Sequence, residues 1–132
     1  MILLDTHAAF WLNRAPEKLS RNATRAIRRA AYSTGLGLSS ISLWELAMLI
    51  EGGRLRVRST TTKGFLDAFV QTPSLAVLEI TVEIAVLAAQ FLPDFPGDPA
   101  DRIIAATARA HDLPIVTRDQ NMQESRFLRT IW

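Results

Sequence analysis

The sequence predicts an α/β fold, namely a three-layer α/β/α sandwich with a central, mostly parallel sheet of four or five strands. Short apolar runs, which are typical of strands buried on both faces, alternate with longer stretches in helical spacing. Alternating strands and helices build parallel sheets, because each connecting helix packs back onto the sheet. Neither a repeat nor a long linker divides the chain, so we expect a single domain over residues 1–132.

The first predicted elements are a strand and two helices. Residues 1–4 (MILL) form an apolar run suited to a central strand, and helical spacing follows up to a break at residues 13–16. Ser20 is a suitable N-cap for a helix that ends near Tyr32. The polar side of that helix carries four arginines, for which solvation is the simplest role and RNA contact is the alternative: Arg21, Arg25, Arg28 and Arg29.

Residues 36–41 predict the second strand. Ser42 is a candidate cap for the next helix, which ends at Gly52 and Gly53. We expect four of its residues at buried positions, namely Trp44, Leu46, Ala47 and Ile50. Three arginines then alternate with apolar residues and would share one side of an extended segment: Arg54, Arg56 and Arg58.

The later elements continue the alternation. We expect a helix over residues 61–71, a strand over 75–80, and a helix over 81–92, followed by a Pro- and Gly-rich loop over 93–99. Asp98, Pro99 and Asp101 then suit the N-cap, N1 and N3 positions of a helix, so capping alone could explain both acids. Two strands remain, a buried one over 113–117 and an edge strand over 128–132.

The composition excludes several classes of protein. Hydrophobic residues at 48% and charged residues at 21% are typical of a globular domain, and no apolar run approaches the length of a membrane span. The absence of cysteine excludes disulfides, thiolate zinc sites and cysteine nucleophiles. The N-terminus lacks the basic region and cleavage site of a signal peptide, so we expect a cytoplasmic protein.

Four acids together suggest a metal site, although each has a simpler explanation alone. Asp5 ends a buried strand, where a carboxylate is costly unless it caps a helix or binds a cation. Glu45 lies among apolar neighbours, and Leu49 offers it no i,i+4 ion pair. Asp119 follows the 113–117 strand, where Arg118 could neutralise it.

The carboxyl ends of parallel strands meet at one edge of a sheet. We therefore expect Asp5, Glu45, Asp101 and Asp119 to converge, and converging carboxylates cannot all stay ionised without a cation between them. Oxygen ligands without a His or Cys cluster suit Mg²⁺ or Mn²⁺. Such an ion, with open coordination positions, supports hydrolysis of phosphodiesters.

Three motifs identify a related family. LDTHAAFWL at residues 4–12, SSISLWELAM at 39–48 and DPADRIIAATARAHDLPIVTRD at 98–119 resemble the PIN-domain ribonucleases. Their order and the chain length resemble the VapC-type toxins of bacterial type II toxin–antitoxin systems. The resemblance implies a Rossmann-like fold and a Mg²⁺- or Mn²⁺-dependent endoribonuclease. It also implies a homodimer that a cognate antitoxin inhibits.

The resemblance also assigns roles to residues. It implies that the four converging acids bind the metal and act in catalysis, with Asp98 and Thr117 as accessory residues. Substrate contact is expected from Thr6, His7, Arg102 and Arg118, whereas Trp11 and Trp44 suit the core, a dimer interface or base stacking. One departure is Gly97, where many members of the family carry a His or another polar residue.

Two other functions compete with a ribonuclease. A non-catalytic PIN-like module would bind RNA or a protein without cleaving it, although acids at all four motif positions argue against this. A phosphotransfer domain with Asp5 as its nucleophile would be expected to carry a second acid two residues later, where this chain has His7.

Overall fold

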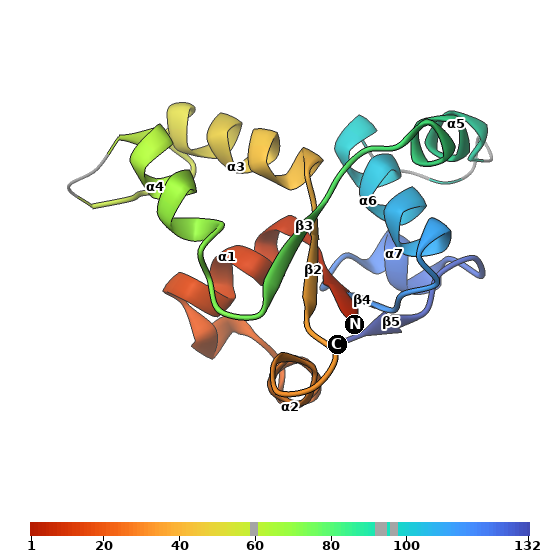
Figure 1. The fold of residues 1–132 in the computed structure, drawn as a ribbon, viewed down its shortest axis with the longest axis horizontal. Coiled ribbons are helices and arrows are strands. Elements are labelled where there is room, and N and C mark those ends of the chain that lie inside the picture. The colour runs from red at the N-terminus through yellow and green to blue at the C-terminus, as the bar shows by residue number, and fades with distance from the viewer. Residues whose placement is uncertain (59–60, 92–94, 96–97) are drawn as a thin grey trace.

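The computed structural model describes residues 1–58, 61–91, 95 and 98–132, and these form one five-stranded sheet flanked by helices (Figure 1). The strands lie in the order β3-β2-β1-β4-β5, and each neighbouring pair is parallel. The predicted α/β/α class is therefore confirmed. The strands are β1 (Ile2–Leu4), β2 (Leu36–Ser39), β3 (Leu75–Leu78), β4 (Ile115–Val116) and β5 (Thr130–Ile131).

The helices fall close to their predicted positions. Ser20 and Asp98 cap α2 and α6 as predicted, because each side chain accepts a hydrogen bond from the backbone N–H three residues later. A 3-10 turn, η1 (Pro16–Lys18), joins the first two helices. The helices are α1 (Thr6–Arg14), α2 (Arg21–Ala31), α3 (Ile41–Glu51), α4 (Thr62–Phe69), α5 (Val82–Gln90), α6 (Pro99–Ala110) and α7 (Gln120–Glu124).

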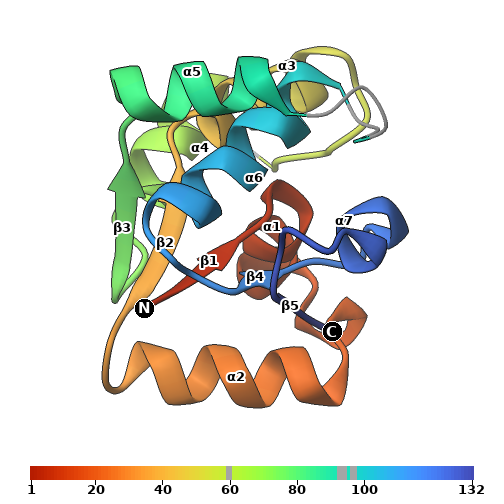
Figure 2. The same cartoon turned by 90° about the vertical axis from the view of Figure 1, so that its right-hand side faces the viewer.

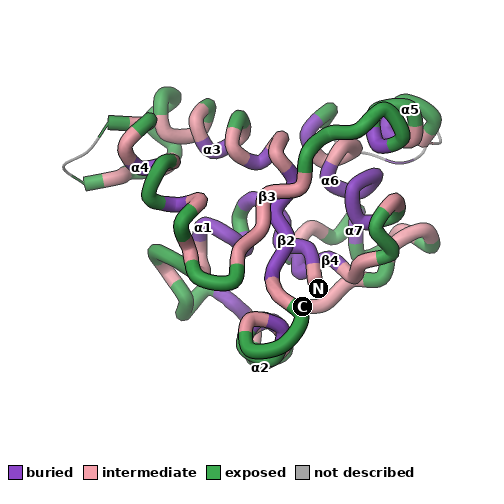
Figure 3. Tube along the Cα trace, viewed as in Figure 1, coloured by how far each residue is buried: buried purple, intermediate pink, exposed green. Residues whose placement is uncertain are grey.

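The sheet separates two apolar cores, as its alternating side chains require. Leu4 and Val116 pack with α1, α2 and α4 on one face. Their neighbours Leu3 and Ile115 pack with α6 and α7 on the other face, and α5 lies outside α6 (Figure 2). Burial is accordingly greatest in the central strands β2, β1 and β4 and on the inner sides of the helices, whereas the edge strands β3 and β5 are half-buried (Figure 3).

Two predictions about α3 are wrong. Its N-cap is Ser40 and not Ser42, because Ile41 already belongs to the helix and not to the preceding strand. Trp44 is 55% exposed, whereas Leu46 is completely buried. Two residues along a helix differ by about 200° in direction, so Trp44 and Leu46 cannot face the same core.

The segment that follows α3 alternates as predicted. Arg54, Arg56 and Arg58 are exposed, while Leu55 and Val57 pack against the core from the other side. No helix in residues 1–58, 61–91 and 98–132 is long and apolar enough to cross a bilayer. Most of the predicted 93–99 loop, including Gly97, lies outside the described residues, as does the predicted helix end at residue 92.

Candidate metal centre

The site lies where the order of the strands changes direction. The chain moves from β1 to β2 and β3 on one side, whereas β4 and β5 lie on the other side of β1. Leu4 pairs with Val116, so Asp5 and Thr117 follow adjacent strands at the same carboxyl edge. A crevice at such a switch point is the usual ligand site of parallel α/β sheets.

Asp5 occupies this crevice as a buried acid. It is 9% exposed, and its Oδ1 accepts a hydrogen bond of 2.6 Å from the Ala8 N–H, which makes it the N-cap of α1. Burial raises the pKa of the Asp5 carboxyl, although hydrogen bonds from Thr117 and Ala8 partly oppose this effect. The helix cap therefore accounts for one of the two carboxylate oxygens of Asp5.

Two helices bring three further acids to the same rim. Glu45 comes from the first turns of α3, while Asp98 and Asp101 come from the start of α6. One carboxylate oxygen from each of the three lies within 4.8 Å of the others. An ion with ligand distances of about 2.0–2.6 Å fits between oxygens at that separation. The cluster contains only hard oxygen donors, so the donor set suits a divalent cation such as Mg²⁺ or Mn²⁺.

The raised pKa of Asp101 reflects its burial and the negative charges around it. Burial, followed by the negative charges of nearby acids, raises the pKa of Asp101 to about 7 from an ordinary value of 3.8. Those acids are, in decreasing order of effect, Asp98, Glu45, Asp119 and Asp5. Among the described residues, Glu45, Asp98 and Asp101 therefore form one group of carboxylates at ligand distance, whereas Asp5 and Asp119 lie outside that group and act on Asp101 through their charge.

Thr117 links two of these acids. It is completely buried, and its Oγ1 accepts a hydrogen bond of 3.0 Å from the Asp119 N–H. The same hydroxyl also acts on Asp5, since it lowers the pKa of the Asp5 carboxyl against the effect of burial. Asp119 in turn caps α7, because its Oδ1 accepts a hydrogen bond of 2.8 Å from the Met122 N–H. Thr117 is therefore placed to orient one acid from each side of the crevice.

The predicted substrate residues occupy two different kinds of environment. Thr6 is 2% exposed, and its hydroxyl donates a hydrogen bond of 2.9 Å to Ser42 Oγ, which ties α1 to α3. Arg102 donates to the carbonyl oxygens of Phe91 and Phe95, so its guanidinium anchors the segment before α6. His7 and Arg118 are exposed. The hydrogen bonds of Thr6 and Arg102 therefore indicate a structural role for both residues and not contact with the substrate.

Two features of the site were missed or given too little weight in the sequence. Ser42 was read as a helix cap, but it is the buried acceptor for Thr6. Asp98 was ranked as an accessory residue, yet its carboxylate lies as close to Glu45 and Asp101 as a ligand would. A spacing of three residues puts Asp98 and Asp101 on the same side of the first helical turn, and that signal was available in the sequence.

Comparison with known proteins gives the site a family context. The PIN domain family model matches residues 2–128. Ribonuclease VapC22 from Mycobacterium tuberculosis is 35% identical over 133 residues, which cover 99% of this chain and 98% of the relative.

Solved structures share the fold at lower identity. VapBC2 from Rickettsia felis, bound to a DNA fragment from its promoter, aligns with a TM-score of 0.71, 18% identity and coverage of 98% and 97% of the two chains. FitAcB from Neisseria gonorrhoeae aligns with a TM-score of 0.69 and 23% identity, covering 98% and 96%. The sarcin-ricin loop cleaving toxin VapC20 from M. tuberculosis aligns with a TM-score of 0.61 and 16% identity, covering 98% and 99%.

Proposed function

This chain belongs to the PIN-domain family, and we propose that it is a metal-dependent endoribonuclease, the toxin of a toxin–antitoxin pair. One observation carries the proposal, which is the grouping of Glu45, Asp98 and Asp101 at the β1–β4 switch point, where one carboxylate oxygen of each lies within 4.8 Å of the others. Such a concentration of carboxylates is unfavourable without a cation, and oxygen-ligated divalent ions are the usual catalysts of phosphodiester hydrolysis.

We assign the metal to Asp5, Glu45, Asp101 and Asp119, with Asp98 as an accessory ligand. A bound Mg²⁺ or Mn²⁺ would supply Lewis acidity toward the phosphate and lower the pKa of the attacking water. Asp5 and Asp119 are held for this role by their helix-capping bonds and by Thr117. His7 and Arg118, both exposed near these acids in the sequence, are available for phosphate groups.

The relatives support a toxin role for the chain, and we propose that it acts in the cytoplasm. The curated relative is named a ribonuclease, and several structural neighbours are toxin–antitoxin complexes. A cognate antitoxin is therefore the expected protein partner. The non-catalytic alternative is not favoured, because this chain retains all four acids at the motif positions, and two of them, Glu45 and Asp101, lie within ligand distance of each other.

A homodimer is the expected assembly, and the apolar surface of α5 supports it. Val82 is 82% exposed and Val86 is 48% exposed, and these residues are one helical turn apart on α5. Ile80 is 41% exposed just before the same helix. A helix with most of its apolar residues facing solvent is typical of a surface that another chain covers.

Cleavage of purified RNA tests the proposed function. The protein should cleave total RNA in Mg²⁺ or Mn²⁺, stop when a chelator is added, and recover when the ion is restored. The Glu45→Gln variant should lose this activity while retaining its circular dichroism spectrum. Tight RNA binding without cleavage in either ion would instead favour the non-catalytic module.

A further inference from the structure

The surface between the acids and helix α2 combines aromatic rings with unpaired cations. We propose that this surface, from His7 through Trp11 and Trp132 to the exposed arginines of α2, binds the single-stranded RNA that flanks the cleavage position. This inference rests on the proposed ribonuclease function and adds the site that holds the rest of the substrate. We call this surface the flanking path.

Aromatic rings form the part of the flanking path nearest the acids. His7 is exposed two residues after Asp5, and its ring centroid lies 5.7 Å from that of Trp11. The ring centroids of Trp11 and Trp132 lie 6.0 Å apart, and both residues pack against the core while remaining only half-buried. Adjacent exposed rings are the usual platforms on which successive RNA bases stack.

Cations continue the path from the indoles to α2. Lys18 Nζ lies 5.9 Å from the centre of the Trp11 ring. Asn22, in the first turn of α2, donates its side-chain N–H to the Trp132 carbonyl oxygen, so the C-terminal end of the chain lies beside the N-terminal end of that helix (Figure 2). The rings and the helix therefore form one continuous surface.

Helix α2 presents a row of arginines to solvent. Arg21, Arg25 and Arg28 recur at spacings of four and three residues, so they share one face, and Arg29 lies beside them. All four are exposed, and with Leu19 and Tyr32 they line a surface depression. Tyr32 is 89% exposed at the end of the helix and offers one more ring for stacking.

No acid neutralises this row among the described residues. Residues 6–44 contain six basic residues and a single acid, Glu17. Within residues 1–58, 61–91, 95 and 98–132, no carboxylate lies within ion-pair distance of the α2 arginines. The chain as a whole has a net charge of only +2, so this excess of positive charge is local. A polyanion is the partner that such a surface complements.

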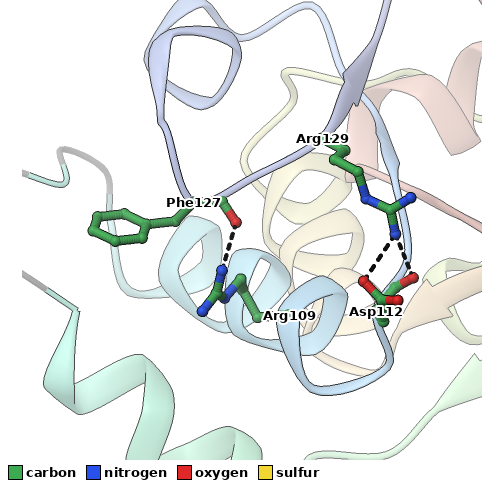
Figure 4. Close-up of polar contacts among 4 residues, drawn as sticks. All are labelled: Arg109, Asp112, Phe127 and Arg129. Carbon is green, nitrogen blue, oxygen red and sulfur yellow. Dashed lines mark hydrogen bonds and ion pairs between the residues drawn. The ribbon is translucent and has the colours of Figure 1, made fainter.

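Three other arginines of this protein, unlike those of α2, are engaged with the protein itself. Arg129 donates to the backbone and side-chain oxygens of Asp112, and Arg109 donates to the carbonyl oxygen of Phe127 (Figure 4). Arg102 bonds to two further carbonyls. The α2 arginines have no such structural bond among the described residues, which leaves their donors available to phosphates.

Oligomers of two lengths distinguish RNA binding along the flanking path from RNA binding at the catalytic acids. We would measure the binding of a labelled oligoadenylate of about 16 nucleotides and of one of about 4 nucleotides, using Asp5→Asn protein so that neither is cleaved. The triple substitution Arg21→Glu, Arg25→Glu, Arg28→Glu should weaken binding of the long oligomer by about 10- to 100-fold and lower its salt slope by about 2. Binding of the short oligomer should stay unchanged.

A matched control tests whether position or only net charge matters. The triple substitution Arg54→Glu, Arg56→Glu, Arg58→Glu changes the charge equally at exposed residues outside the path. It should weaken binding of the long oligomer much less. An equal loss in both triple variants would overturn the path, as would unchanged RNA binding accompanied by weaker binding of the antitoxin.

Quenching of tryptophan fluorescence provides a second, independent test of RNA binding along the flanking path. The long oligomer should quench the fluorescence of a Trp44→Phe variant, which retains Trp11 and Trp132. The quench should largely disappear in the Trp11→Phe, Trp132→Phe variant, which retains only Trp44. A quench that follows Trp44 instead would contradict the assignment.

The outcomes also distinguish this inference from the proposed function. If the wild-type protein cleaves no RNA but binds the long oligomer through the α2 arginines, the flanking path is supported and the ribonuclease function is overturned. Metal-dependent cleavage of long RNA that the α2 triple variant performs as well as the wild type would overturn only the path.

Discussion

The acids at the sheet edge and the arginines of α2 are both clusters of like charge, but they exist under opposite conditions. Of the acids, Asp5 is buried, Glu45, Asp101 and Asp119 are half-buried and Asp98 is exposed, and burial together with the neighbouring negative charges raises the pKa of Asp101 to about 7. The arginines are exposed and spaced along a helix face, and solvent screens their repulsion. The acids are therefore unfavourable together without a cation or a proton, whereas the α2 arginines are tolerated without any ligand.

This difference sets the expected size of each mutational effect. A change among the acids alters the metal site, the protonation of its neighbours and the stability of the metal-free protein together. A change among the α2 arginines should alter binding and leave the fold intact. The predictions below test this contrast, beginning with the largest expected effect.

The Asp5→Asn variant should lose most of its RNA cleavage, by at least about 100-fold, because a ligand oxygen becomes a neutral amide. The fold should remain, since Asn is as good an N-cap as Asp and can still accept from the Ala8 N–H. Asp112→Asn is the control, because Asp112 is an exposed acid paired only with Arg129. Cleavage by Asp5→Asn at the rate of Asp112→Asn would remove Asp5 from the metal site.

The Asp101→Asn variant should change how stability depends on pH in the presence of a chelator. Between about pH 4 and 7, folded Asp101 retains a proton that the unfolded chain has released, so its contribution to stability falls as the pH rises through this interval. The raised pKa of Asp5 acts in the same direction.

Thermal melts from pH 4 to pH 8 would measure this effect. The melting temperature of the wild type should fall more steeply with rising pH than that of Asp101→Asn. Asp67→Asn, which changes an exposed acid on α4, should follow the wild type. Parallel curves for the wild type and Asp101→Asn would mean that Asp101 is not crowded by other acids.

The Arg102→Ala variant should be destabilised by about 1–3 kcal/mol, because two backbone carbonyls lose a charged donor. Urea denaturation would measure this loss, with Arg118→Ala as the exposed comparison. Equal stability of the two variants would show that Arg102 does not anchor the segment before α6.

The smallest effect is expected for stability at α2. Arg25→Ala and Arg28→Ala should each change the free energy of unfolding by no more than about 0.5 kcal/mol, since both side chains are exposed and unpaired among the described residues. A loss above about 1 kcal/mol in urea denaturation would show that these arginines stabilise the fold.

Most of the fold could be predicted from local patterns. Apolar runs gave the buried strands, and capping residues such as Ser20 and Asp98 gave the helix starts, because both signals depend on neighbouring residues. The predictions failed at α3, where nearly every residue is apolar. A helix without a polar side has no pattern that identifies its buried face, so the exposure of Trp44 could not be read from the sequence.

The acids of the site could be named from strand ends and motifs, but their relative distances could not. The position of Glu45 beside Asp98 and Asp101 depends on how α3 packs against α6, and no local pattern encodes that contact. For the same reason, the hydrogen bond between Thr6 and Ser42, which are separated by 36 residues, could not be predicted from local patterns.

Direct titration with Mn²⁺ or Mg²⁺ tests the metal centre most directly. Calorimetry at neutral pH should show binding to the wild-type protein, release of protons as the ion binds, and at least about tenfold weaker binding to Asp101→Asn. The Asp112→Asn control should bind as the wild type does. Absence of binding to the wild type, or equal affinity in Asp101→Asn, would contradict the assignment of these acids to a metal.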